Sequence, residues 1–157
     1  MRKPITSVAA CETQVRSDCR FMNIVVSCVT VLVVLAIHDR ALVYSSRWVR
    51  GLPIAGLRPS LCVLAALVAH HLEVLVFAVG WMVLLDAGQI SFTPDTTRFF
   101  DVLYFSGAVY TSLGFGDIVP EGPGRLFAVT EAISGLVLIA WTASFTFLQM
   151  QRNWRER

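Results

Sequence analysis

The run Thr111-Ser112-Leu113-Gly114-Phe115-Gly116-Asp117 is polar and glycine-rich, and it lies between long apolar segments of a chain that is 55% hydrophobic. Non-helical backbone at membrane depth is tolerated only where protein buries it or where it lines a water-filled path. The two glycines, at alternate positions, can adopt backbone angles that a side chain would forbid. The run can therefore turn successive carbonyl oxygens toward one axis. Four copies around that axis would form stacked oxygen rings that replace the water shell of a cation, so the run predicts an ion-conducting pore.

The composition of the chain supports a membrane protein. Its 157 residues are enough for one domain, and the mean hydropathy of +0.65 with 15% charged residues predicts a multi-pass integral membrane protein in contact with the lipid bilayer. The net charge of +2 is too small to indicate nucleic-acid binding. We recognise no nucleophile–base pair, metal-binding cluster or phosphate-binding loop, so we expect neither an enzyme nor a cofactor other than the permeant ion.

The rest of the chain divides into segments by composition. Residues 21–37 are almost continuously apolar, and their 17 residues reach the lower limit for a membrane-spanning helix. We expect an uncleaved transmembrane helix here, with a re-entrant or interfacial segment as the alternative. The next stretch carries arginines and aromatic residues that suit lipid headgroups. The predicted segments are a polar N-terminal tail (1–20), an N-terminal transmembrane segment (21–37), a basic interfacial linker (38–59), a pore module (60–150) and a short basic C-terminal tail (151–157).

The first long helix of the pore module contains ionisable residues at membrane depth. Such groups usually face protein or water rather than lipid. His70 and Glu73 are three residues apart, so they share a helix face and can hydrogen-bond to each other, whereas His71 points elsewhere. This set of three residues predicts either a pH-sensitive network or a structural one, and nothing in the sequence places it on the ion path.

A short helix is expected directly before the glycine-rich run. The stretch from Arg98 to Tyr110 is too short to span a bilayer, and its C-terminal end would point its partial negative charge at a cation. We expect one of three residues to cap its N-terminus: Asp95, Thr96 or Thr97.

A final long apolar helix follows from Arg125 to Met150. It contains Glu131, a second intramembrane acid, and Gly135, which is either a hinge or a site of close packing.

Charge distribution predicts the orientation. Lysines and arginines flank the predicted membrane segments in the linker and in the last six residues. Acidic residues flank the glycine-rich run instead, at Asp86, Asp95, Asp117 and Glu121. The positive-inside rule therefore places the linker and the C-terminus in the cytoplasm and the glycine-rich run toward the outside.

With these motifs in view, residues 60–150 resemble the pore module of potassium channels, and the closer look-alikes are small bacterial pore-loop proteins with an extra N-terminal span. The family filter reads Thr-Val-Gly-Tyr-Gly-Asp, and here Ser112 to Asp117 stand in its place, preceded by Thr111. Further shared elements are His71-Leu72-Glu73, Tyr104-Phe105-Ser106 and the stretch from Glu131 to Gly135. The resemblance implies an all-α integral membrane fold with outer helix, pore helix, selectivity filter and inner helix, in the inner membrane of a bacterium.

The resemblance also implies a homotetramer that conducts monovalent cations, with potassium preferred. The ion ligands would be the carbonyl groups of Ser112, Leu113, Gly114 and Phe115, together with the Ser112 hydroxyl, and the filter would be supported by Thr111, Gly116, Asp117 and Glu131. Ser112 lacks the methyl group of the family threonine, and Phe115 lacks the tyrosine hydroxyl that braces the family filter. Two alternatives therefore stay open, a weakly selective channel that also passes sodium, and a non-conducting interaction or sensor protein.

Overall fold

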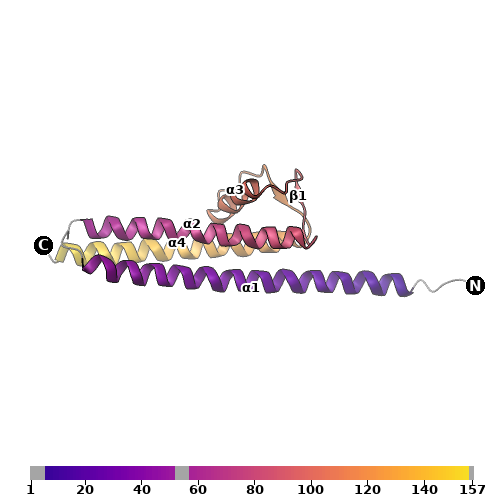
Figure 1. The fold of residues 1–157 in the computed structure, drawn as a ribbon, viewed down its shortest axis with the longest axis horizontal. Coiled ribbons are helices and arrows are strands. Elements are labelled where there is room, and N and C mark those ends of the chain that lie inside the picture. The colour runs from indigo at the N-terminus through magenta and orange to yellow at the C-terminus, as the bar shows by residue number, and fades with distance from the viewer. Residues whose placement is uncertain (1–5, 52–56, 156–157) are drawn as a thin grey trace, which may run out of the picture.

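The computed structural model describes residues 6–51 and 57–155, with side chains described for residues 21–49, 51 and 57–155. Its helices are α1 (Thr6–Arg50), α2 (Arg58–Asp86), α3 (Phe99–Tyr110) and α4 (Gly124–Arg155), and its two short strands are β1 (Phe92–Thr93) and β2 (Val119–Pro120), as Figure 1 shows. The described part of the chain contains three helical stretches long and apolar enough to cross a membrane, Phe21–Val49, Arg58–Asp86 and Gly124–Arg155. The predicted all-α multi-pass membrane fold is confirmed.

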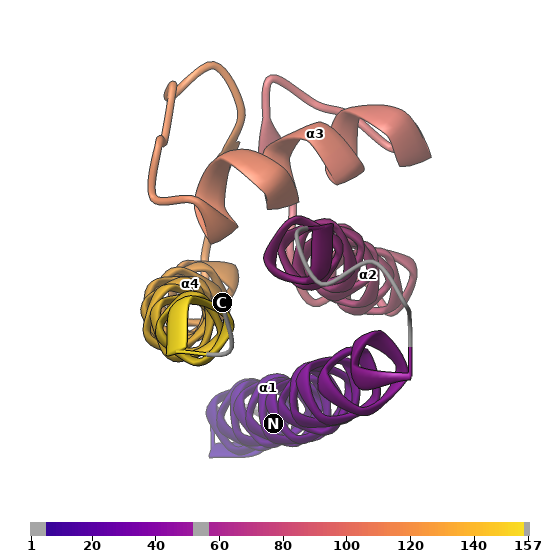
Figure 2. The same ribbon diagram turned by 90° about the vertical axis from the view of Figure 1, so that its left-hand side faces the viewer.

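The three long helices run side by side, and α3 lies at one end of the bundle (Figure 1). Helix α3 packs on α2 and α4 on the side away from α1 (Figure 2). Antiparallel pairing of β1 with β2, with Phe92 opposite Pro120, joins the loop before α3 to the loop after the glycine-rich run. The glycine-rich run is therefore held at both ends, by α3 before it and by β2 after it.

An aromatic cluster fixes α3 to the bundle. Trp81 of α2 is fully buried, and its ring centroid lies 5.1 Å from that of Phe105 on α3 and 4.7 Å from that of Phe127 on α4. Phe92 of β1 packs on the same tryptophan with a centroid distance of 5.5 Å. Edge-to-face aromatic contacts add about 0.5–1.5 kcal/mol each beyond the buried area. The position of α3 is therefore set by large apolar side chains.

The predicted basic linker is wrong over residues 38–50, because α1 continues through them without a break. The buried residues His38, Leu42, Ser45 and Val49 recur at helical spacing and form one face, while Arg40 and Arg47 are exposed beside it. The arginines of this stretch suggested a position at the lipid headgroups. The stretch instead has a buried face, as the preceding residues of the same helix do. Residues 52–56 of the predicted linker lie outside the described residues.

Two other boundaries differ from the prediction. Helix α1 begins at Thr6 rather than near residue 21, and it extends past the other helices at its N-terminal end (Figure 1). A re-entrant first segment would have to reverse direction, so the continuous α1 contradicts that alternative. At α3 the N-cap is Arg98 without a side-chain capping bond, so the predicted cap is wrong. Thr96 instead donates a hydrogen bond to the Asp101 carboxylate at 2.9 Å.

A candidate ion-conduction site

Backbone donors tie the start of the glycine-rich run to the end of α3. The N–H of Ser112 donates to Val109 O at 2.8 Å, and the N–H groups of Leu113 and Gly114 both donate to Ala108 O, at 2.9 and 3.1 Å. Within the described residues, the carbonyl oxygens from Ser112 to Phe115 accept no hydrogen bond from the chain. These four residues are exposed in the single chain, so their carbonyl oxygens are free to accept another partner, such as a cation.

The backbone conformation of the run alternates. Ser112, Gly114 and Gly116 have φ values of +57°, +53° and +78°, and within the described residues no other member of the run has a positive φ. Alternation between left-handed and ordinary angles is the conformation in which successive carbonyl groups can turn toward one side of the chain; the alternating φ signs are observed, and the direction of the carbonyl groups stays a prediction. The strained member is Ser112, because a left-handed conformation is uncommon for a residue with a Cβ atom. A positive φ could be expected at the two glycines from their residue type. At Ser112 the residue type gives no such indication.

Tyr104 of α3 braces the far end of the run. Its ring stacks on the Phe115 ring with centroids 6.1 Å apart and planes 7° apart. Its hydroxyl donates to Asp117 Oδ2 at 2.9 Å, while Asp117 Oδ1 accepts the Ile118 N–H at 3.1 Å. The hydrogen bond to the Asp117 carboxylate raises the pKa of the Tyr104 phenol. Asp117 therefore accepts hydrogen bonds as predicted, and the Tyr104 stack braces Phe115 without a hydroxyl on its ring.

Glu131 lies fully buried between three helices. Its two carboxylate oxygens accept hydrogen bonds from Trp81 Nε1 of α2 at 2.6 Å and from Ser106 Oγ of α3 at 2.5 Å. It contacts the pore helix rather than the glycine-rich run itself. The support that we predicted for Glu131 is therefore indirect, because it fixes α3, which in turn holds the run.

Gly135 allows the backbones of α3 and α4 to approach closely. A Cβ atom at this position would overlap the carbonyl oxygen of Tyr110 and lie 2.9 Å from its carbonyl carbon. Helix α4 continues unbroken through this position from Gly124 to Arg155. Of the two predicted roles, the structure displays close packing.

A second buried acid, Glu73, joins α2 to two other helices. His70 Nδ1 lies 3.0 Å from Glu73 Oε2, so the contact predicted from their spacing is present. Tyr110, the last residue of α3, also donates its hydroxyl hydrogen to Glu73. The third partner is His38 of α1, whose Nδ1 lies 2.9 Å from Glu73 Oε1. Sequence reasoning missed His38, although its place on the buried face of α1 at helical spacing from Leu42 could have signalled it.

His71 does not belong to this cluster. It is exposed, and its Nδ1 lies 2.8 Å from the backbone oxygen of Leu67 in its own helix. The prediction that it points away from Glu73 is right, and its grouping with His70 and Glu73 in one network is wrong.

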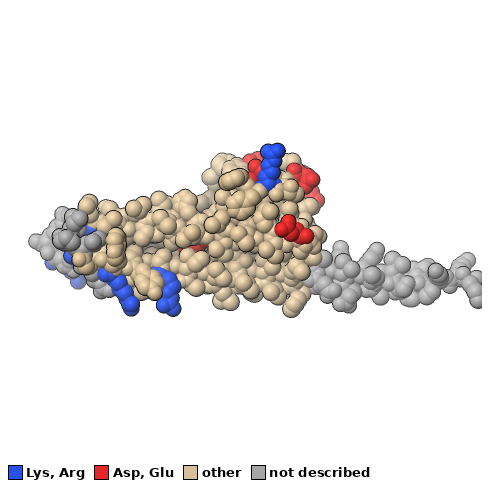
Figure 3. All heavy atoms as spheres, viewed as in Figure 1, with Lys and Arg blue, Asp and Glu red and all other residues tan. Residues whose placement is uncertain are grey.

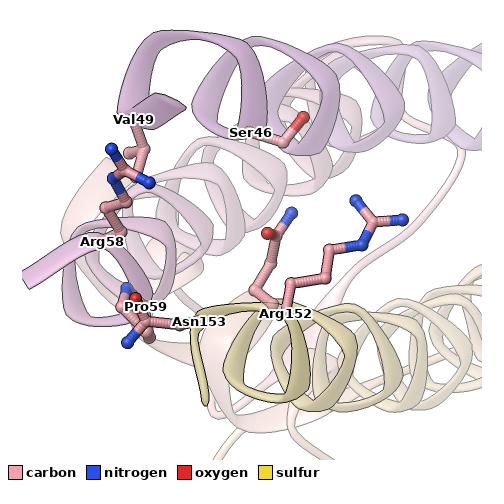
Figure 4. A pocket seen from close by; sticks show the side chains of 7 residues that line it. Ser46, Val49, Arg58, Pro59, Arg152 and Asn153 are labelled. Atoms are coloured by element: carbon pink, nitrogen blue, oxygen red, sulfur yellow. The ribbon is translucent and has the colours of Figure 1, made fainter. Parts of the chain in front are cut away.

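Charged side chains are unevenly distributed along the bundle (Figure 3). Basic residues gather where α1 ends and α2 begins, and acidic residues gather around α3. At the basic end, a pocket of about 50 Å³ is lined by residues that include Arg58, Arg152 and Asn153 (Figure 4). This pocket lies at the opposite end of the bundle from the glycine-rich run (Figures 1 and 4), so it is not part of the candidate filter.

Comparison with known proteins agrees with this geometry. A family model described as "Ion channel" matches residues 71–152, which include the glycine-rich run, Glu73, Glu131 and Gly135. The chain belongs to this ion-channel family. The chain is also similar to Protein LctB of Bacillus caldotenax, with 37% identity over an alignment of 92 residues; the match covers 53% of this chain and 69% of the relative.

A second relative covers less of both chains. Protein LctB of Geobacillus stearothermophilus is 34% identical over an alignment of 85 residues, and the match covers 49% of this chain and 63% of that protein. No solved structure matches the chain. The ion-channel match begins after His70 and does not include α1. In the contact between His38 of α1 and Glu73, only Glu73 therefore lies in the matched region.

Proposed function

We propose that this ion-channel family member is a homotetrameric, potassium-preferring cation channel that works by passive permeation. The carbonyl oxygens of Ser112, Leu113, Gly114 and Phe115, with the Ser112 hydroxyl, would replace the hydration shell of K⁺. The observation that carries the proposal is the alternating backbone, whose first N–H groups, through Gly114, are bonded to α3 and whose carbonyl groups accept no hydrogen bond from the described residues. Permeant K⁺ is the expected ligand, and no further cofactor is required.

The tetramer is supported by what a single chain leaves uncovered. Leu113 and Phe115 are 61% and 63% exposed, although both are large and apolar and lie in the run that would form the filter. One run cannot surround an ion, whereas cyclic symmetry around the pore axis would give each ion a ring of carbonyl oxygens. Neighbouring copies would cover these side chains and complete the site.

Charge separation supports an orientation. The basic end, with exposed Arg40, Arg47, Arg152 and Arg155, would face the cytoplasm of a bacterial cell, and the filter would face outward. Acidic residues at the filter end raise the local concentration of cations within about one Debye length. With three spans, the N-terminus would lie on the side opposite to the C-terminus.

Reconstitution tests the proposal directly. The purified protein is placed in planar bilayers, reversal potentials are measured under opposed K⁺ and Na⁺ gradients, and native mass spectrometry gives the number of chains. We expect four chains and a reversal potential close to the K⁺ equilibrium value. A folded tetramer without cation current would favour a non-conducting interaction or sensor protein and would contradict the proposal.

A weakly selective cation channel is the second candidate. The observation that favours it is the bracing of Phe115, which rests on a ring stack with Tyr104 and lacks a hydroxyl contact. In this case the reversal potential would stay near zero in opposed K⁺ and Na⁺ gradients, and Phe115→Tyr would move it toward the K⁺ value. An unchanged reversal potential in Phe115→Tyr would count against this candidate.

A further inference from the structure

Five polar side chains from all four helices meet at one point inside the bundle. They are His38 of α1, His70 and Glu73 of α2, Tyr110 of α3 and Thr142 of α4. The side chains of His38 and Glu73 are 0% exposed and that of His70 is 16% exposed. Ionisable groups at membrane depth are costly, so the charge state of this cluster is strongly constrained.

Glu73 forms the centre of the cluster. Its two carboxylate oxygens face one imidazole each, with 2.9 Å from Oε1 to His38 Nδ1 and 3.0 Å from Oε2 to His70 Nδ1. Oε2 also accepts the hydroxyl hydrogen of Tyr110, and that hydroxyl oxygen lies 2.9 Å from His70 Nδ1. On the far side of the rings, Thr142 Oγ1 lies 3.0 Å from His70 Nε2 and 3.4 Å from His38 Nε2.

These contacts can be counted against the hydrogens available. The six contacts need five polar hydrogens. Two come from Nδ1 of His38 and Nδ1 of His70, and the second is shared between Glu73 and Tyr110. One comes from the Tyr110 hydroxyl, and one is needed between Thr142 and each imidazole Nε2. If Glu73 is ionised and both rings are neutral, the cluster has four, one each on His38, His70, Tyr110 and Thr142. One contact would then join two lone pairs in a part-buried place, which is unfavourable.

The charges lead to the same conclusion. Among the described residues, the ion-pair partners of Glu73 are His38 and His70, and both carry charge only when protonated. The other elements packed here contribute neutral groups, namely the Tyr110 phenol of α3 and the Thr142 hydroxyl and Trp141 ring of α4. The other buried acid, Glu131, is bonded to Trp81 and Ser106 instead. An ionised Glu73 with two neutral rings would leave a net negative charge inside the membrane.

We propose that the cluster of His38, His70, Glu73, Tyr110 and Thr142 is a proton-binding site that holds one proton beyond those of an ionised Glu73 and two neutral imidazoles. This proton supplies the fifth hydrogen and makes the cluster electrically neutral. It allows one ring to donate from both nitrogens, to Glu73 and to Thr142. The proton therefore ties α1 and α4 to α2 and, through Tyr110, to the last residue of the pore helix.

A metal ion is the other occupant that this chemistry allows. His38, His70 and Glu73 offer ligand atoms within 4.8 Å of one another, and two histidines with a glutamate form a zinc-type ligand set. The proton is favoured because each carboxylate oxygen already lies at hydrogen-bond distance from a different imidazole nitrogen. A tetrahedral metal ion would have to replace both imidazole–carboxylate hydrogen bonds.

The protonation state can be read directly, because the chain has three histidines. Protein labelled with ¹⁵N-histidine is reconstituted in liposomes at pH 8, and solid-state NMR distinguishes imidazolium from neutral imidazole. An exposed histidine titrates near pH 6.5, so about 3% of it is charged at pH 8. We expect one of the three rings to be imidazolium, or, if the proton resides on Glu73, an infrared band of a buried protonated carboxyl group.

Matched variants assign the signal. His71→Gln alters the exposed histidine next to the cluster and should leave the signal unchanged, whereas Glu73→Gln should remove it. Three neutral rings in the unmodified protein, with no protonated carboxyl band that Glu73→Gln removes, would overturn the proposal. So would stoichiometric binding of Co²⁺, seen by its visible absorption and lost in His38→Gln but retained in His71→Gln. None of these readouts requires ion conduction, so they separate this proposal from the proposed channel function.

Discussion

The glycine-rich run and the buried carboxylates behind it use opposite chemistry. The run presents main-chain carbonyl groups that have no hydrogen-bond partner among the described residues, and its side chains are largely exposed. Glu73 and Glu131 lie fully buried, and each is bonded to side chains from neighbouring helices. The element proposed to contact ions therefore makes few side-chain contacts within its own chain. Its geometry depends on side chains that contact the pore helix from behind.

The closest support for the run is the contact between Gly135 and the Tyr110 carbonyl, so enlarging Gly135 should have the largest effect. In Gly135→Ala the new methyl group would collide with main chain, which cannot rotate away as a side chain can. We expect a loss of at least about 3 kcal/mol and little folded protein, measured by thermal unfolding and size exclusion in detergent.

Gly107→Ala is the matched control for this change. Its Cβ atom would meet Val74 at an ordinary 3.8 Å, and alanine favours helix over glycine by up to about 1 kcal/mol. Its melting temperature should be equal or higher. A Gly135→Ala protein that melts at the same temperature as Gly107→Ala would contradict the close approach of α3 and α4.

Removing the Glu131 carboxylate should have the next largest effect. Glu131→Ala leaves the Trp81 N–H and the Ser106 hydroxyl buried without their acceptor and opens a cavity, with an expected loss of about 2–4 kcal/mol. Glu131→Gln keeps one acceptor oxygen and should lose less than half as much. Chemical denaturation of the two variants in detergent measures the difference, and equal losses would show that the hydrogen bonds to this side chain matter little.

The same comparison explains which features the sequence could predict. The glycine-rich run, the three spans and the contact between His70 and Glu73 depend on neighbours a few residues apart, so local pattern was sufficient. His38 meets Glu73 across 35 positions, and Glu131 meets Trp81 across 50. Such pairs form only when helices pack, and no local pattern encodes them. The α1 boundary was wrong for a related reason, since its arginines were visible in the sequence whereas its buried face was not.

A change within the run should spare the fold and affect conduction. Gly116 has φ +78°, and apart from its chain neighbours no atom of the described residues lies within 4 Å of where its Cβ would be, so Gly116→Ala is strained without a clash. A left-handed residue with a Cβ costs roughly 1–2 kcal/mol. We expect a folded protein whose K⁺ flux into liposomes falls at least tenfold, because the strain would be relieved by turning the adjacent carbonyl groups.

Gly122→Ala provides a control with the same kind of strain outside the run. Gly122 has φ +61° and equally open surroundings, but it lies in the loop that leads to α4. Its flux should be close to that of the unmodified protein. Equal losses of flux in the two variants would show that the effect comes from general strain rather than from the carbonyl row.

The smallest expected effect concerns the Tyr104 brace. Tyr104→Phe keeps the stack on Phe115 and removes the hydroxyl bond to Asp117, so we expect less than a threefold change in the ratio of K⁺ to Na⁺ permeability. The bond raises the pKa of Tyr104 in the folded protein, so its contribution is complete below about pH 10 and is lost as the pH rises through the raised pKa. Alkaline pH should therefore reduce selectivity in the unmodified protein and have less effect in Tyr104→Phe.

Tyr44→Phe, at an exposed tyrosine of α1, should respond to alkaline pH as the unmodified protein does. If Tyr104→Phe responds in the same way as Tyr44→Phe, the run is held by the ring stack and its backbone bonds to α3, and the hydroxyl of Tyr104 takes no part in its support.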